Sequence, residues 1–126
     1  MICATPHNVF MAYEIRATPE FREWMLTLSR EERESFDTAV NLLKEKGPVL
    51  ARPYVDTVKG SAFPNMKELR TAHDKHLALR AFFAFDPTRA AILLIGGDKH
   101  GKRGFYEKLI RKADGLYREH LRSLKK

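Results

Sequence analysis

The chain has 126 residues and a single cysteine, Cys3. This length predicts one domain whose core needs no disulfide or metal, and a lone cysteine excludes a disulfide framework and a cysteine zinc site. The N-terminus lacks the continuous apolar stretch of a secretory signal, and no segment approaches the roughly 18 apolar residues that span a bilayer. We therefore expect a cytoplasmic protein with no membrane partner.

The net charge of +7 is confined to the C-terminal segment. Residues 1–98 hold 13 Lys and Arg against 13 Asp and Glu, whereas residues 99–126 hold 10 against 3. Clustered positive charge is typical of nucleic-acid binders, although a solvated helix in a basic protein gives the same count about as often. Nucleic acid is therefore one candidate partner, and an ordinary basic surface is the other interpretation.

The N-terminal part divides into a leader and a first strand. Residues 1–11 show no periodicity and are expected to be a disordered leader, with Met11 as an alternative start. Residues 12–126 are expected to form the single domain. Within residues 10–17 a weak apolar alternation predicts a first strand that lies beside the main sheet.

A helical hairpin is expected next. Thr18 followed by proline is typical of a helix start, and Ser29 with Glu32 matches a capping box for a second helix that ends at Gly47. Apolar residues recur at helical spacing in both segments, so the two helices share an apolar face. Residues 48–64 contain three prolines and predict an extended connection.

The second half of the chain predicts a sheet. Three runs rich in β-forming residues, 66–70, 77–85 and 90–95, are separated by short turn-forming loops, which indicates antiparallel strands. The third run is apolar on both faces, as in an interior strand, and Gly96 begins a turn. A basic amphipathic helix starts at Phe105. The predicted fold class is α+β, with a small antiparallel sheet packed by the N-terminal helical hairpin and a basic C-terminal helix.

Two arginines, Arg70 and Arg80, stand inside these largely apolar strands. A buried arginine is rarely kept without a partner. Strand alternation places both, with Glu68 and Phe82, on the face away from the hairpin, which is predicted to be open. The two arginines become neighbours only in a register with an even sum of residue numbers, for example 70 opposite 80.

Two other patterns are set aside. Residues 96–102 nearly match a phosphate-binding loop, but Arg103 stands where the magnesium-ligating Ser or Thr belongs, and the βαβ context is missing. His73 and His76 bracket a turn at metal-like spacing, but no third ligand is nearby in sequence. We expect no metal and no cofactor.

The element order and several short motifs together resemble the RelE/HigB family of type II toxin–antitoxin toxins, in its phage-derived, Gp49-like branch. The resemblance covers about residues 12–122 and is specific as a set, and it implies a RelE-like fold. The motifs are MKELR at 66–70, FAFDP at 83–87, AILL at 91–94 leading to GDK at 97–99, Asn65, and VDTVKGS at 55–61.

The resemblance implies a metal-independent mRNA endoribonuclease that acts on the 70S ribosome, arrests translation and growth, and is silenced by a cognate antitoxin. That antitoxin is expected to be a helix-turn-helix protein, through which alone the complex reaches DNA. RNA is cleaved when its 2′-OH is deprotonated and attacks the adjacent phosphate. Such an enzyme supplies a base, an acid and positive charge.

The resemblance also implies roles for particular residues. Arg70 and Arg80 are expected to clamp the phosphate, since a planar fork of fixed charge suits the oxyanion. Tyr106 is expected to stack on a base or polarise the 2′-OH. Lys67 and Lys99 are candidates for electrostatic stabilisation or proton transfer. Which residue is the base and which the acid is left open.

Glu68 is a candidate general base, and a salt bridge to Arg80 is an equally good interpretation of it. Basic residues of the C-terminal segment are expected to bind the RNA backbone with salt-dependent affinity. These are Lys102, Arg103, Lys108, Arg111 and Lys112.

The alternative is a catalytically inactive protein of the same fold that acts as a nucleic-acid- or antitoxin-binding partner. What separates the two is whether Arg70, Arg80 and Tyr106 converge within reach of one phosphate.

Overall fold

The structure is a computed structural model that describes residues 12–71, 79–98 and 104–125. The predicted leader, the first two residues of the predicted strand 77–85, and Lys99, Lys102 and Arg103 lie outside the described residues. The elements follow in this order: β1 (Ile15–Ala17), α2 (Pro19–Leu26), α3 (Arg30–Lys46), the 3-10 turn η1 (Gly47–Val49), β2 (Val55–Thr57), β3 (Lys67–Arg70), β4 (Leu79–Phe85), β5 (Ala91–Asp98) and α4 (Phe105–Ser123).

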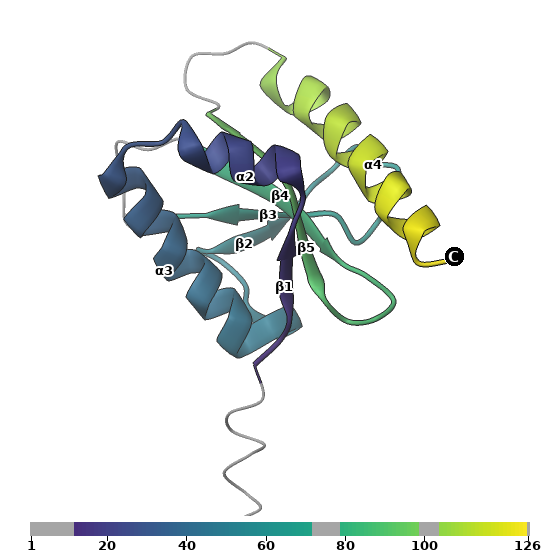
Figure 1. Cartoon of the computed structure of the whole chain (residues 1–126), viewed down its shortest axis with the longest axis horizontal. Coiled ribbons are helices and arrows are strands. Elements are labelled where there is room, and N and C mark those ends of the chain that lie inside the picture. Colours follow the sequence, from purple (N-terminus) through teal and green to yellow (C-terminus); the bar gives the residue numbers. More distant parts are fainter. Residues whose placement is uncertain (1–11, 72–78, 99–103, 126) are drawn as a thin grey trace, which may run out of the picture.

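The strands form one five-stranded sheet in the order β1-β5-β4-β3-β2. Strands β2 to β5 are antiparallel neighbours, and β1 pairs in parallel with β5. Arg70 lies directly opposite Arg80, so the sheet has the register in which the two arginines become neighbours. Figure 1 shows the sheet between the helices, with α4 on the side away from α3.

The helical hairpin begins and ends where its capping residues predict. The Thr18 hydroxyl accepts a hydrogen bond from the Phe21 amide at 2.9 Å, and Ser29 and Glu32 form a reciprocal capping box. α3 ends at Lys46, directly before Gly47, whose φ of 58° favours glycine. These local signals therefore set both ends of the hairpin.

The predicted extended connection contains a strand that the sequence analysis missed. β2 is only three residues long, Val55–Thr57, and forms the edge of the sheet beside β3. Three residues are too few for a clear alternation, and the surrounding prolines favoured an irregular segment. The sheet therefore extends one strand further on this side than predicted.

The predicted turn at Gly96 is wrong, because β5 continues through Gly97 to Asp98. The two glycines allow helices to approach both faces of the strand. A Cβ atom at Gly96 would overlap the indole of Trp24 on α2, and one at Gly97 would lie 2.8 Å from the ring of Phe105 on α4. Glycine here serves close packing within a strand.

The prediction of an open sheet face is also wrong. Phe36, Leu43 and Phe83 belong to a core on the side of α2 and α3, while Met66 and Phe82 belong to a second core under α4. All five are fully buried. The reason is that α4 lays its apolar stripe over β4 and β5, so both faces of the sheet are covered.

Polar contacts attach α4 to the sheet along its length. Asp114 accepts hydrogen bonds from the Ser61 hydroxyl at 2.5 Å and from the Ala62 amide at 2.9 Å. Further along, the Tyr117 hydroxyl donates to the Phe85 carbonyl, and the ring Nε2 of His120 lies 2.6 Å from Asp86 Oδ2. Among the described helices, none is long and apolar enough to cross a membrane.

We expect Gly96→Ala to lower the free energy of unfolding by about 1–3 kcal/mol, because the added methyl group overpacks the contact with Trp24. Gly115→Ala is the matched control: the interior of α4 has open space at Gly115, and alanine favours a helix by up to about 1 kcal/mol. Chemical denaturation of both variants is the measurement. Equal stability of Gly96→Ala and the wild type would contradict the packing described.

The pKa of Asp86 predicts a loss of stability in acid. Burial raises this pKa, but the hydrogen bonds from His120, Thr88 and Ala90 lower it by more than burial raises it. The net pKa of Asp86 is therefore below its ordinary value. A carboxyl whose pKa is depressed on folding stabilises the protein above its unfolded-state pKa of about 4, and this contribution is lost as the pH falls through the folded-state value.

We expect Asp86→Asn to lower the free energy of unfolding by about 1–3 kcal/mol at pH 7. The variant should also lose less stability than the wild type between pH 5 and pH 3, as measured by urea unfolding. Parallel stability curves for the two proteins would show that Asp86 has an ordinary pKa.

Candidate active site

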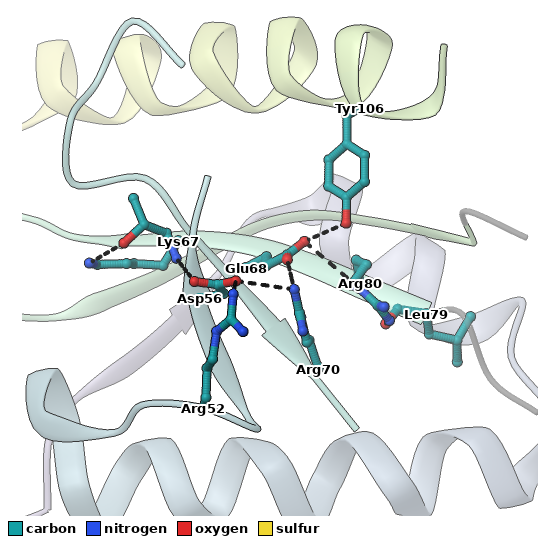
Figure 2. Close-up of polar contacts among 9 residues, drawn as sticks. Arg52, Asp56, Lys67, Glu68, Arg70, Leu79, Arg80 and Tyr106 are labelled. Carbon is teal, nitrogen blue, oxygen red and sulfur yellow. Dashed lines mark hydrogen bonds and ion pairs between the residues drawn. The ribbon is translucent and has the colours of Figure 1, made fainter. Parts of the chain in front are cut away.

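Strand pairing brings charged side chains together under the N-terminal end of α4. Arg70 at the end of β3 and Arg80 near the start of β4 are opposite residues, so their side chains leave the same face. Alternation adds Glu68 on β3 and its partner Asp56 on β2. Figure 2 shows Tyr106, from the first turn of α4, pointing down at this group.

The carboxylate of Glu68 is the centre of the group. Its Oε2 accepts hydrogen bonds from Arg70 Nη2 at 2.6 Å and Nε at 3.1 Å. Its Oε1 accepts from the Tyr106 hydroxyl at 2.9 Å and lies 3.8 Å from Arg80 Nε. The salt bridge to Arg80 that the sequence allowed is therefore present, together with a closer one to Arg70. Glu68 itself is only 4% exposed.

Arg80 lies deeper than Arg70. Its side chain is 12% exposed, against 27% for Arg70. Arg80 Nη1 donates to the Leu79 carbonyl at 2.8 Å, while the buried Nε makes no hydrogen bond to any described residue. A buried donor that lacks a hydrogen bond destabilises the folded state. The negative charge of Glu68, 3.8 Å from Arg80 Nε, offsets this cost.

A second carboxylate extends the network to the sheet edge. Asp56 Oδ2 lies 3.3 Å from Arg70 Nη2 and 2.8 Å from Arg52 Nη2. The hydrogen bond from Arg52, followed by that from the Thr57 amide, lowers the pKa of Asp56. Partial burial would lower the pKa of Arg70, but Glu68 and Asp56 raise it above its ordinary value. Arg70 therefore stays positively charged at neutral pH.

Tyr106 is held by its ring as well as by its hydroxyl. The ring stacks on Phe82 with centroids 5.9 Å apart and planes inclined by 24°. Burial, and then the hydrogen bond and charge of Glu68, raise the pKa of Tyr106, while Arg80 partly offsets them. The phenol therefore keeps its proton at neutral pH and donates it to Glu68.

The structure does not bring Lys67 to this group. Because Lys67 pairs with Phe83, its side chain leaves the opposite face of β3. Its Nζ donates to the Thr57 hydroxyl at 3.1 Å and borders a groove of about 600 Å³ that lies between η1 and the sheet edge. The position of Lys67 on the opposite face of β3 gives no support to a role in the same chemistry.

The remaining predicted residues lie on or before α4. Lys108, Arg111 and Lys112 are exposed along the helix that carries Tyr106. Lys99, Lys102 and Arg103 fall outside the described residues.

Sequence reasoning missed Asp56 and Arg52. Neither residue could be assigned to the site without the strand β2, because only the pairing of β2 with β3 places Asp56 beside Glu68. The motif that contains Asp56 was recognised, but without a strand the side chain had no predicted direction. Across the described ranges 12–71, 79–98 and 104–125, no cluster of three His, Cys, Asp or Glu residues could hold a metal ion.

Comparison with known proteins identifies relatives in sequence. A family model described as phage derived protein Gp49-like (DUF891) matches residues 23–118. The chain is 44% identical over 99 residues to "Putative toxin HigB2" and 46% identical over 97 residues to "Putative toxin HigB3", both of Mycobacterium tuberculosis (strain ATCC 25618 / H37Rv). The first match covers 78% of this chain and the second 76%. The chain spans about half the length of HigB2 (49%) and 82% of HigB3.

Solved structures share the fold at low identity. The archaeal RelE-RelB complex from Pyrococcus horikoshii OT3 contains a chain that matches with a TM-score of 0.56 and 12% identity, over 73% of this chain and all of that one. The isolated E. coli RelE toxin matches with a TM-score of 0.58 and 13% identity, over 79% and 98%. The chain thus belongs to the Gp49-like (DUF891) family of phage-derived proteins and has a RelE-like α+β fold.

Proposed function

We propose that the chain is the toxin of a type II toxin–antitoxin module and an endoribonuclease that cleaves mRNA. Relatives that are named as toxins and the RelE-like fold support this proposal. The observation that carries it is the convergence of Arg70, Arg80 and Tyr106, whose polar atoms all lie within 3.8 Å of the one carboxylate of Glu68. From this convergence we infer that the same three groups can also contact one phosphate.

In this mechanism the 2′-OH of RNA attacks the adjacent phosphorus, and the bond to the 5′-oxygen breaks. The phosphoryl oxygens gain negative charge in the transition state. The guanidiniums of Arg70 and Arg80 supply fixed positive charge there, in a planar geometry that suits phosphate oxygens. No step requires a metal ion.

Tyr106 contributes a protonated phenol on a rigid support. Its stacking on Phe82 fixes the ring, so the phenolic oxygen can orient the 2′-OH, and the ring edge can meet a base. Its raised pKa disfavours a phenolate base at neutral pH. Lys99 follows Asp98 in the sequence and lies outside the described residues, and it stays a candidate for electrostatic stabilisation or proton transfer.

The basic face of α4 supplies affinity rather than chemistry. Lys108, Arg111 and Lys112 follow Tyr106 on the exposed side of the helix, where they lie along the path of an RNA backbone that enters the site. Phosphate contacts of this kind position a strand without reading its sequence. We place the substrate mRNA on the 70S ribosome, in the cytoplasm, with growth arrest as the result of its cleavage.

The proposed partner is a cognate antitoxin. A chain of similar fold is known in the complex of archaeal RelE with RelB. We propose a helix-turn-helix antitoxin that silences this chain and supplies the DNA contacts of the complex.

One observation favours the alternative, a catalytically inactive binding protein. Arg70 is paired with both Glu68 and Asp56, so its charge is largely compensated before RNA arrives. A substrate phosphate must compete with these carboxylates.

We expect Arg80→Ala to abolish growth arrest and to slow mRNA cleavage by about 10²-fold or more, because one preorganised donor to the oxyanion is lost. Tyr106→Phe should slow cleavage less, since its ring still stacks. Induced expression with primer extension on a reporter mRNA is the measurement. Arg30→Ala, an exposed arginine on α3, is the control and should arrest growth like the wild type. A harmless wild-type protein that leaves mRNA intact would favour the inactive alternative.

We expect the triple variant Lys108→Gln, Arg111→Gln, Lys112→Gln to bind single-stranded RNA more weakly. Loss of three phosphate contacts should also reduce the slope of log affinity against log salt by about 2. Fluorescence anisotropy at several salt concentrations measures both. The control triple Arg30→Gln, Lys44→Gln, Lys46→Gln removes the same charge from α3, and an equal loss in both triples would show that net charge alone attracts RNA.

A further inference from the structure

We propose that Glu68 is the positioning residue of this site, which holds Arg70 with one carboxylate oxygen and Tyr106 with the other. This assignment rests on the proposed function. It replaces the role of general base that the sequence suggested, since Glu68 acts through the groups it holds.

Both oxygens of Glu68 are already occupied. Oε2 accepts the two hydrogen bonds from Arg70, and Oε1 accepts that of Tyr106 and faces Arg80. A general base must reach the proton it removes within about 3 Å, or through one water. The side chain of Glu68 is 5% exposed, so a 2′-OH that enters the site meets the arginines and the phenol first.

The contact with Arg70 fixes the direction of its guanidinium. Glu68 receives the Nε and Nη2 edge of the fork, and Nη1 is not used by this carboxylate. Glu68 therefore turns a flexible side chain at the end of β3 into a group of set orientation. Misplacement of a catalytic group by about 1 Å can cost 10²-fold in rate.

The contact with Tyr106 links α4 to the sheet. The phenolic proton is donated to Glu68, so the lone pairs of the oxygen remain directed away from the carboxylate. Stacking on Phe82 sets the plane of the ring, and the hydrogen bond to Glu68 sets where the hydroxyl points. One carboxylate thus aligns a cation from β3 and a phenol from α4.

The opposite role for Glu68 would be inhibitory, and we call it a latch. In that case the carboxylate would take the place of the substrate phosphate and weaken RNA binding. Removal of its charge would then increase affinity or rate, so the two roles predict changes of opposite sign.

The test uses Glu68→Gln, which keeps the size of the side chain but cannot accept from both partners. Cleavage of an mRNA on 70S ribosomes should slow about 10- to 100-fold in kcat, with KM within about 3-fold of the wild type. Adding Tyr106→Phe should cost less in Glu68→Gln than in the wild type, because a phenol that Glu68 no longer holds in place contributes less to the rate. Glu107→Gln, the neighbouring exposed glutamate, is the control and should be fully active.

A second measurement does not depend on cleavage. The pKa of Tyr106, followed by NMR of ¹³C-labelled tyrosine and assigned with Tyr106→Phe, should be lower in Glu68→Gln than in the wild type, because the charge and acceptor of Glu68 raise it. Glu107→Gln should leave this pKa unchanged. The readout applies to an inactive protein as well, so failure of the proposed nuclease function is distinguishable from failure of this assignment.

Three results would overturn the assignment. An unchanged Tyr106 pKa in Glu68→Gln would show that the contact is not made. Faster cleavage or tighter RNA binding would identify a latch. Additive losses with Tyr106→Phe, together with loss of the acidic limb of the pH profile, would restore Glu68 as the base. Should Glu68→Gln not fold, Glu68→Asp is the second variant, because its side chain is shorter by one methylene and its oxygens lie further from Arg70 and Tyr106. It should show a smaller loss of kcat and a smaller change in the pKa of Tyr106.

Discussion

The buried charge of Glu68 is the constraint on which the site depends. A carboxylate under a helix is tolerated only when other groups compensate it, and removal of one partner of a buried pair costs about 3–5 kcal/mol. Arg70, Arg80 and Tyr106 are those partners, and they come from β3, β4 and α4. The requirement to satisfy one carboxylate therefore assembles, from distant parts of the sequence, the residues that we assign to phosphate binding.

This arrangement exists only because α4 covers the sheet. Gly97 lets the first turn of the helix approach β5, and Tyr106 reaches the sheet from that turn. The far end of the helix is fixed by hydrogen bonds between His120 and Asp86 and between Tyr117 and the backbone of β4. The position of one phenol thus depends on contacts that begin more than ten residues further along the chain, and a change there would misalign the site without touching it.

The sequence predicted the local features and the face of the sheet that each side chain takes, left the register open, and missed what depends on distant packing. Capping residues located the hairpin because their hydrogen bonds lie within three residues. Strand alternation placed Arg70 and Arg80 on one face because side chains alternate faces strictly, while their pairing came from the structure. The covering of the sheet by α4 is a contact between remote segments, and no local pattern reports it. The sequence predicted a turn at Gly96 because glycine permits one. In the structure glycine is needed there because a Cβ atom would overlap the indole of Trp24.

The distribution of charge separates attraction from chemistry. The +7 net charge lies in the C-terminal segment, where Lys108, Arg111 and Lys112 face solvent, and long-range attraction of RNA follows from such a field. Inside the site, Arg70 is already matched by Glu68 and Asp56, so it adds little to that field. A compensated cation gains most where new negative charge develops, which is on the phosphoryl oxygens in the transition state. Under the proposed function, α4 would govern how tightly RNA binds, and the Glu68 cluster would govern how fast it is cut.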